Sequence, residues 1–362
     1  MQVKSQLVSL KPYEPGKPID EVKRELGLDK VVKMASNENP FGCSEKAKEA
    51  IRNSLNQLHI YPDGYAYDLK VKLAKHLNVK KEQIILGSGS DEVILILCRA
   101  LLSPEKNTVM AYPTFSQYKH NAIIEGAQIR EVPLIDGEHD LDGMLKQIDE
   151  NTAIVWVCNP NNPSGNYIDK ERFLSFLKKV PKNVLVVSDE AYYEYVVAED
   201  YPDTISLLDE FPNLVVLRTF SKAYGLSSLR VGYGVGNETF IRSLDPARPP
   251  FNTTTLSQVA AAAALDDQTF IEESRRKNRE GIEQFYAFCE KHQLKYYPTQ
   301  TNFILIEFDR SGDEVFQYLL KRGFIVRSGV ALGFPNAVRI TIGTKEENEE
   351  IIHHLTEMLK ER

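Results

Sequence analysis

The sequence predicts an α/β protein: a large domain with a mostly parallel sheet covered by helices, followed by a smaller α+β domain. The stretches "AIVWV" (153–157) and "VLVV" (184–187) are apolar at every position, which is typical of strands buried on both faces of a parallel sheet. Segments with helical periodicity lie between most of the apolar runs, as in a sheet with helices on both sides. After residue 255 this alternation gives way to long amphipathic segments, which indicate a second domain.

We divide the chain into an N-terminal arm with the start of the small domain (1–40), the large domain (41–255) and the rest of the small domain (256–362). The arm is mostly irregular, with one short helix within 11–27. In the large domain the patterns predict helices at 44–57, 65–77 and 91–102, and strands at 83–90, 107–113, 127–134, 153–160, 184–192, 214–221 and 230–236. In the small domain they predict helices at 256–267, 268–294, 312–323 and 345–359, with strands at 301–308 and 337–343.

The composition argues against several classes of protein. Acidic residues outnumber basic ones by 51 to 44, for a net charge of −7, so we expect neither nucleic acid nor an anionic membrane as a partner. No apolar run approaches the roughly 18 residues of a membrane span. The four cysteines are far apart and form no CxxC pair, which favours reduced thiols in a cytoplasmic protein over disulfides or a metal site.

Polar residues follow four of the predicted strands, and in an open α/β sheet ligands bind beyond the carboxyl ends of the strands. The four segments are "GSGSDE" (87–92), "NPNNPSG" (159–165), "SDEAY" (188–192) and "TFSKAYGLSSLRVGY" (219–233). Taken singly, they have ordinary explanations: a capped helix start, a turn, a capping Asp and a surface lysine.

Taken together, the four segments supply an anion cradle, an amide, a carboxylate with a tyrosine, and a group of hydroxyls with Lys222 and Arg230. A phosphorylated heteroaromatic carbonyl with a protonated ring nitrogen satisfies all of them. Pyridoxal 5′-phosphate has these properties: a lysine amine binds its aldehyde, an Asp pairs with its ring nitrogen, and helix N–H groups, hydroxyls and Arg bind its phosphate.

The order of the motifs resembles that of the fold-type I pyridoxal-phosphate-dependent aminotransferases over nearly the whole chain. The matching stretches are "NENPFG", "GSGSDE", "YPTF", "NPNNPSG", "SDEAY", "TFSKAYGLSSLRVGY" and "VRITIG". The stretches "LKPYEPGKPIDEVKRELGLDKVVKMASNENPFG" and "YPDGY" are similar to those of the members that act on histidinol phosphate.

For the cofactor, the resemblance implies a role for each matching residue. Lys222 forms the Schiff base and then carries the proton, and Asp189 keeps the ring nitrogen protonated. The other expected contacts are the ring's phenolic oxygen (Asn162, Tyr192), the ring face (Phe115) and the phosphate (Ser90, Asp91, Thr219, Ser221, Arg230). Tyr61 is expected to reach the phosphate of a neighbouring subunit, which implies a homodimer with shared active sites.

For the substrates, the resemblance implies transamination between L-glutamate and histidinol phosphate, in histidine biosynthesis. In "AVRITIG", Val338 and Ile340 occupy one face of a predicted strand and Arg339 the other. A planar guanidinium suits a carboxylate, and Arg339 is the expected contact of glutamate's α-carboxylate. Arg327 is the expected contact of the substrate phosphate, with a surface salt bridge as its alternative. Tyr13 and Asn37 are expected to close the site.

Other functions stay open from the sequence alone. An aminotransferase of the same family that acts on aromatic amino acids would need no phosphate site. A phosphothreonine decarboxylase has a similar lysine motif. The aminotransferase-like half of a transcription regulator is disfavoured because no basic helix-turn-helix segment precedes residue 44, and a nicotinamide dehydrogenase because the dinucleotide fingerprint is absent.

Overall fold

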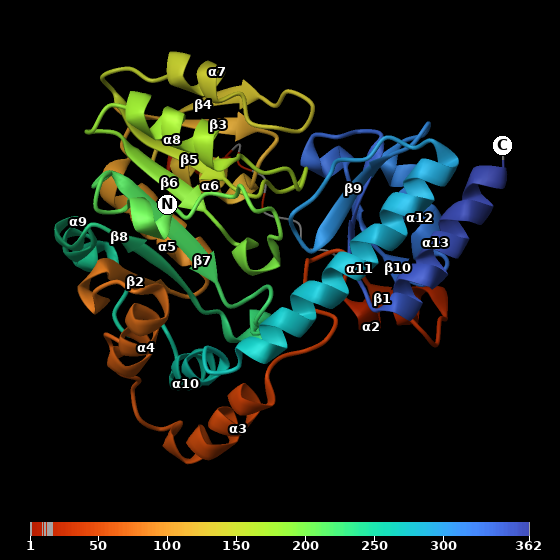
Figure 1. Ribbon diagram of the computed structural model, residues 1–362, viewed down its shortest axis with the longest axis horizontal. Helices are drawn as coiled ribbons and strands as arrows, with labels where there is room; N and C mark the ends of the chain where they lie inside the picture. Colours follow the sequence, from red (N-terminus) through yellow and green to blue (C-terminus); the bar gives the residue numbers. More distant parts are fainter. Residues whose placement is uncertain (1, 9, 11, 13–16, 362) are drawn as a thin grey trace.

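The computed structural model describes residues 2–8, 10, 12 and 17–361. They form a large body, orange to green in Figure 1, and a smaller, mainly blue one. The long helix α11 (Gln268–His292) runs from the large body along the small one (Figure 1). The fold class predicted from the sequence, a largely parallel α/β domain with a smaller α+β domain, is confirmed.

The large body is built on a sheet with seven strands among the described residues, in the order β2-β8-β7-β6-β5-β3-β4. Strands β3 to β7 pair in parallel, whereas β8 is antiparallel to both β2 and β7. Strand β2 therefore runs in the same direction as β7, and its carboxyl end lies at the same edge of the sheet. The strands are β2 (Ile84–Gly87), β3 (Asn107–Tyr112), β4 (Gln128–Pro133), β5 (Thr152–Cys158), β6 (Leu185–Asp189), β7 (Leu214–Thr219) and β8 (Gly232–Gly236).

Helices cover both faces of this sheet, which explains the fully apolar strands. In β5, Val155 and Val157 belong to one buried apolar cluster, whereas Ile154 and Trp156 belong to another. Helices that contribute to the first cluster are α3 (Glu45–Ser54), α4 (Tyr67–Leu77), α7 (Leu141–Lys146), α8 (Lys170–Lys179) and α10 (Thr255–Ala264). Helices that contribute to the second are α5 (Ser90–Leu101), α6 (Ser116–Ile124) and α9 (Glu238–Ser243). Alternate side chains of each strand are thus buried on opposite faces of the sheet, away from water.

The small body contains a three-stranded antiparallel sheet in the order β11-β12-β9, among the described residues. The N-terminal part of the chain joins it, because β1 pairs in parallel with β10, with Val32 opposite Phe324; in Figure 1 the red β1 lies beside the blue β10. Its strands are β1 (Val32–Lys33), β9 (Phe303–Glu307), β10 (Phe324–Ile325), β11 (Arg327–Ser328) and β12 (Ala337–Thr341). Its other helices are α2 (Ile19–Leu26), α12 (Gly312–Leu320) and α13 (Lys345–Lys360).

The helix predicted at 44–57 ends as the 3-10 helix η1 (Leu55–Gln57) after α3, and the short α1 (Ser5–Val8) contacts α6. The other 3-10 helices are η2 (Lys81–Gln83), η3 (Tyr193–Tyr195), η4 (Ile205–Leu207), η5 (Ser227–Leu229), η6 (Asp245–Ala247) and η7 (Val330–Leu332). Within the described ranges, no helix has both the length and the apolar character that crossing a bilayer requires. The domain boundaries at 40 and 255 stay predictions.

Candidate active site

A cavity of about 370 Å³ lies beyond the carboxyl ends of the central strands, and residues of the small body close its other side. All the site residues predicted from the sequence line it, except Tyr13 and Tyr61. Tyr13 lies outside the described residues. Tyr61 is 80% exposed, and its ring stacks on Phe251 at 4.8 Å between centroids.

Lys222 lies in the turn that follows β7, and its Nζ donates a hydrogen bond to the carbonyl oxygen of Ser36 at 3.2 Å. Burial, together with the positive charge of Arg339, lowers the pKa of the Lys222 amine to about 8. A substantial fraction of this amine is therefore neutral near pH 7–8, and a neutral amine is the form that attacks a carbonyl.

The turn around Lys222 requires a glycine. Gly225 has a φ of +68°, and its N–H donates to the carbonyl oxygen of Lys222 at 2.9 Å. A Cβ at this position would overlap the carbonyl oxygen of Gly42. The glycine thus allows the segment after Lys222 to turn tightly against the N-terminal part of the chain.

Asp189 is the last residue of β6, and only 2% of it is exposed. Its Oδ2 accepts a hydrogen bond from the hydroxyl of Tyr118 at 2.6 Å, and its Oδ1 accepts one from the N–H of Ala191 at 3.2 Å. Burial raises the pKa of the Asp189 carboxyl to about 6, although the hydrogen bond from Tyr118 opposes this shift. A cation bound against Asp189 would compensate its buried charge.

An anion cradle forms where the segment after β7 meets the N-terminus of α5, a helix of 12 residues. Arg230 Nη1 donates to Ser221 Oγ at 3.1 Å, and Arg230 Nη2 lies 3.5 Å from Asp91 Oδ2. A Cβ on Gly89 would lie 2.5 Å from Arg230 Nη2, so a glycine at this position lets the guanidinium approach the helix start. Free N–H groups at a helix N-terminus, hydroxyls and a guanidinium suit a phosphate.

Thr219, Asn162 and Tyr192 also line the cavity. Thr219 Oγ1 accepts from the N–H of Ser221 at 3.1 Å, which fixes the start of the turn before Lys222. The hydroxyl of Tyr192 accepts from Asn37 Nδ2 at 2.9 Å, and burial raises the pKa of this hydroxyl. Asn162 Oδ1 accepts from Arg339 Nη1 at 2.5 Å. Asn37 and Arg339 thus connect the wall formed by the small body to the large sheet.

The two predicted anion-binding arginines are directly opposite each other on neighbouring antiparallel strands, Arg327 on β11 and Arg339 on β12. Side chains at such positions have Cβ atoms about 5 Å apart and lie on the same face of the sheet. Both line the cavity, whereas Val338 and Ile340 point into the apolar core. Two like charges opposite each other destabilise a sheet, so bound anions between or beside them would be stabilising.

Sequence reasoning missed other side chains that line the cavity or support it, including Gln117, Cys158 and Tyr118. Gln117 and Cys158 line the cavity. Tyr118 holds Asp189, and its ring stacks on Trp156 at 4.7 Å and contacts Phe115 edge-to-face at 5.5 Å. The spacing of Phe115 and Tyr118 at i and i+3 within a helical pattern could have indicated a shared face.

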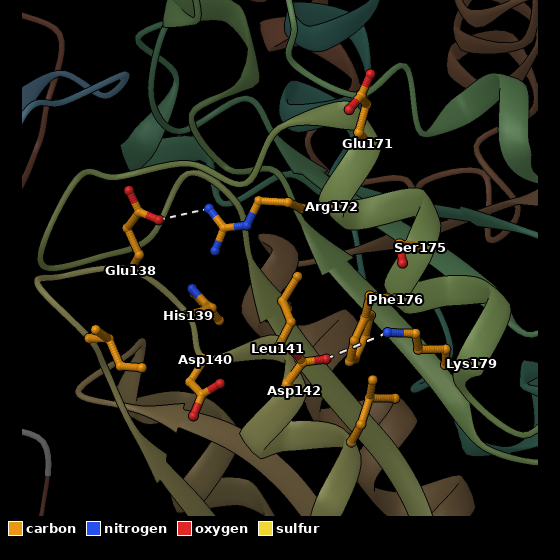
Figure 2. Close-up of a pocket in the computed structure, with 12 residues that line it drawn as sticks. Glu138, His139, Asp140, Leu141, Asp142, Glu171, Arg172, Ser175, Phe176 and Lys179 are labelled. Carbon is orange, nitrogen blue, oxygen red and sulfur yellow. Dashed lines mark hydrogen bonds and ion pairs between the residues drawn. The ribbon is translucent and has the colours of Figure 1, made fainter.

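A second cavity, of about 570 Å³, lies between residues 135–142 and α8 (Figure 2). Four of its charged side chains form two ion pairs: Arg172 Nη1 lies 2.7 Å from Glu138 Oε2, and Lys179 Nζ lies 3.6 Å from Asp142 Oδ1 (Figure 2). None of the predicted site residues lines it. The smaller cavity at the strand ends is therefore the candidate active site.

The chain is similar to known proteins over nearly its whole length. A family model described as aminotransferase class I and II matches residues 29–355. The chain is 62% identical to a histidinol-phosphate aminotransferase of Geobacillus sp. (strain WCH70), over 100% of this chain and 99% of that protein. It is 61% identical to a protein of the same name from Bacillus subtilis (strain 168), over 99% of this chain and 100% of that protein.

The structure is also similar to a crystal structure of histidinol-phosphate aminotransferase from Sinorhizobium meliloti in complex with pyridoxal-5′-phosphate. The TM-score is 0.91 at 27% sequence identity, and the match covers 99% of this chain and 98% of that one.

Proposed function

Because the chain belongs to the aminotransferase class I and II family, we propose that it transfers the amino group of L-glutamate to imidazole acetol phosphate, in histidine biosynthesis. The products are 2-oxoglutarate and L-histidinol phosphate. Full-length identity of 62% and 61% to histidinol-phosphate aminotransferases supports this reaction. The structural observation that carries it is the opposed pair Arg327 and Arg339 in the cavity of Lys222.

The residues of the cavity fit pyridoxal 5′-phosphate. This cofactor supplies an aldehyde that condenses with amines and a ring that accepts an electron pair when its nitrogen is protonated. The buried carboxylate of Asp189 suits the protonated ring nitrogen. Ser90, Ser221 and Arg230 at the N-terminus of α5 suit the phosphate, and Phe115 lines the cavity where a planar ring would lie.

Lys222 has two tasks in the proposed reaction. Its amine, with a pKa lowered to about 8, would hold the cofactor and, once free, would take the proton from the substrate's Cα and deliver it to the former aldehyde carbon of the cofactor. Asp189 would keep the ring nitrogen protonated, because its charge opposes loss of that proton. Asn162 and Tyr192 would hold the ring through its phenolic oxygen.

The two substrates enter the same cavity in turn, so it must accept a carboxylate in one half-reaction and a phosphate in the other. Arg339 binds the α-carboxylate of glutamate, and Asn162 and the carbonyl of Ala35 hold its guanidinium in place. Arg327, on the neighbouring strand, binds the phosphate of histidinol phosphate. Tyr13 and Asn37 close the site over the bound substrate.

Replacing Arg327 by Ala separates the two half-reactions. A charge-assisted hydrogen bond contributes about 1.5–3 kcal/mol, so we expect kcat/KM for histidinol phosphate to fall about 10-fold to 100-fold. The value for glutamate should change by less than about twofold, because Arg339 remains. Steady-state kinetics of each half-reaction test this, with Arg276→Ala on an exposed face of α11 as the control. An aromatic aminotransferase would instead keep the kinetics of its best substrate in Arg327→Ala.

The active unit in this proposal is a homodimer with shared sites. The large apolar side chains of 55–67 are exposed, among them Leu58 at 62% and Tyr65 at 63%, and Phe251 next to Tyr61 is 48% exposed. An exposed apolar surface of this kind is typical of an interface. Tyr61 lies outside its own chain's cavity, which fits a contact with the cofactor phosphate of the partner.

We also place the protein in the cytoplasm. Cys43, Cys98, Cys158 and Cys289 are all free thiols, and free thiols are typical of a reducing compartment. Burial raises the pKa of the Cys158 thiol, which lines the cavity, to about 12. This thiol therefore stays protonated and unreactive beside the cofactor.

A further inference from the structure

A buried ion pair lies behind the active-site ends of β6 and β7. Arg218 Nε and Nη2 donate to Glu190 Oε2 at 3.0 and 2.9 Å, and the two side chains are 4% and 0% exposed. Glu190 Oε1 accepts from the hydroxyls of Ser188, at 3.2 Å, and Thr204. The Arg218 guanidinium also lies 3.4 Å from the centre of the Tyr193 ring. The buried charges are therefore paired and hydrogen-bonded, as burial requires.

The pair links the two strand ends that carry the central site residues. Glu190 directly follows Asp189. Arg218 directly precedes Thr219 and is four residues before Lys222. Asp189 is opposite Leu217 on the paired strands, and the N–H of Glu190 donates to the carbonyl of Leu217 at 2.8 Å. Asp189 and Thr219 line the cavity, whereas Glu190 and Arg218 do not.

Such a pair acts mainly by fixing the relative position of the two segments that carry it. A buried ion pair is weak evidence for stability, because desolvation offsets much of the attraction, yet its geometry is specific. Two donors of a rigid guanidinium on one carboxylate oxygen fix the distance and orientation between two backbones. The backbones held here carry Asp189 and Lys222, which line the same cavity.

Given the cofactor chemistry proposed above, on which this inference rests, we infer that Glu190 and Arg218 are a positioning pair. They hold Asp189 on β6 and the segment from Thr219 to Lys222 on β7 at the separation that the cofactor requires. Their contribution is to cofactor binding and turnover, and the fold does not depend on them.

The test compares the double variant E190Q/R218M, which removes both charges, with the wild-type protein and with E194Q. Glu194 is buried near the same pair and interacts with the charge of Arg218. Among the hydrogen bonds and ion pairs described for the pair, none involves Glu194, so E194Q is a matched control. Three quantities are measured: the urea midpoint of the cofactor-free protein, the Kd for pyridoxal 5′-phosphate, and kcat with KM for glutamate. The single tryptophan, Trp156, reports cofactor binding by its fluorescence, since it stacks on Tyr118 beside Asp189.

We expect E190Q/R218M to unfold at the wild-type urea midpoint but to bind the cofactor about 10-fold to 100-fold more weakly, the scale on which small misplacements of catalytic groups act. With saturating cofactor, kcat should fall by a similar factor and KM for glutamate by less than about twofold. E194Q should match the wild type in all three quantities.

Two results would overturn the inference. A double variant that does not fold would mean that the pair supports the fold itself, and a folded double variant with wild-type Kd and kcat would mean that it has no positioning role. If wild-type protein does not bind pyridoxal 5′-phosphate, the proposed function fails first, and the wild-type titration reports this separately.

Discussion

Replacing Lys222 by Ala should abolish turnover, with a loss of at least about 10⁴-fold in kcat, because one amine both holds the cofactor and moves the proton. The folded structure should persist, since the Lys222 side chain makes one hydrogen bond, to the carbonyl of Ser36, among those described for it. Initial rates and the visible absorbance of the purified protein measure the effect.

Chemical trapping identifies which lysine binds the cofactor. Borohydride reduction of the wild-type protein with pyridoxal 5′-phosphate should leave the cofactor attached to Lys222, detected by peptide mass spectrometry. Lys178→Ala, which removes an exposed lysine on α8, should behave like the wild type. Attachment at another lysine in the wild type, or a kcat of Lys222→Ala above about 10⁻⁴ of the wild-type value, would contradict the assignment.

Replacing Asp189 by Asn should lower kcat on the order of 10²-fold to 10³-fold, the usual effect of removing one preorganised electrostatic contact. The amide has the size of the carboxyl group and can keep the hydrogen bond from Tyr118, but it has no charge to keep the ring nitrogen protonated. Steady-state kinetics measure the loss, with Asp142→Asn, on a side chain that is 78% exposed, as the control. A kcat within about threefold of the wild type would show that Asp189 does not have this role.

We expect the affinity for the cofactor to depend on pH differently in the wild type and in Asp189→Asn. The pKa of Asp189 is raised to about 6, so its attraction for a ring cation is present above this pH and is lost as pH falls through it. Cofactor affinity of the wild type should therefore fall more steeply below pH 6 than that of Asp189→Asn. The cofactor phosphate titrates in both proteins, so the difference between the two curves reports Asp189.

The parallel sheet explains why much of the site could be predicted from the sequence. Strands of one direction end at one edge, so residues after each apolar run had to meet there. This holds even for Ser90 after β2, which is separated from β7 by the antiparallel strand β8. Because β8 is antiparallel to both neighbours, β2 runs in the same direction as β7, and the start of α5 lies next to Arg230.

Features that depend on register or on the face of a strand could not be predicted. Strands β10 and β11 have two residues each, too few to show a period, so the opposition of Arg327 and Arg339 emerges only from the pairing. Tyr118 reaches Asp189 from a helix on one side of the sheet, and no local pattern specifies this partner. The pairing of Glu190 with Arg218 needs the alignment of β6 with β7 as well as the direction of each side chain.

The central claim, amino transfer with a phosphorylated imidazole substrate, is tested most directly by a spectral titration of the wild-type protein loaded with pyridoxal 5′-phosphate. Addition of histidinol phosphate should convert the visible band of the lysine-linked cofactor to the near-ultraviolet band of its amine form. The concentration of histidinol phosphate required should be about 10-fold to 100-fold lower than that of phenylalanine or tyrosine. A conversion by phenylalanine or tyrosine, with none by histidinol phosphate, would contradict the account.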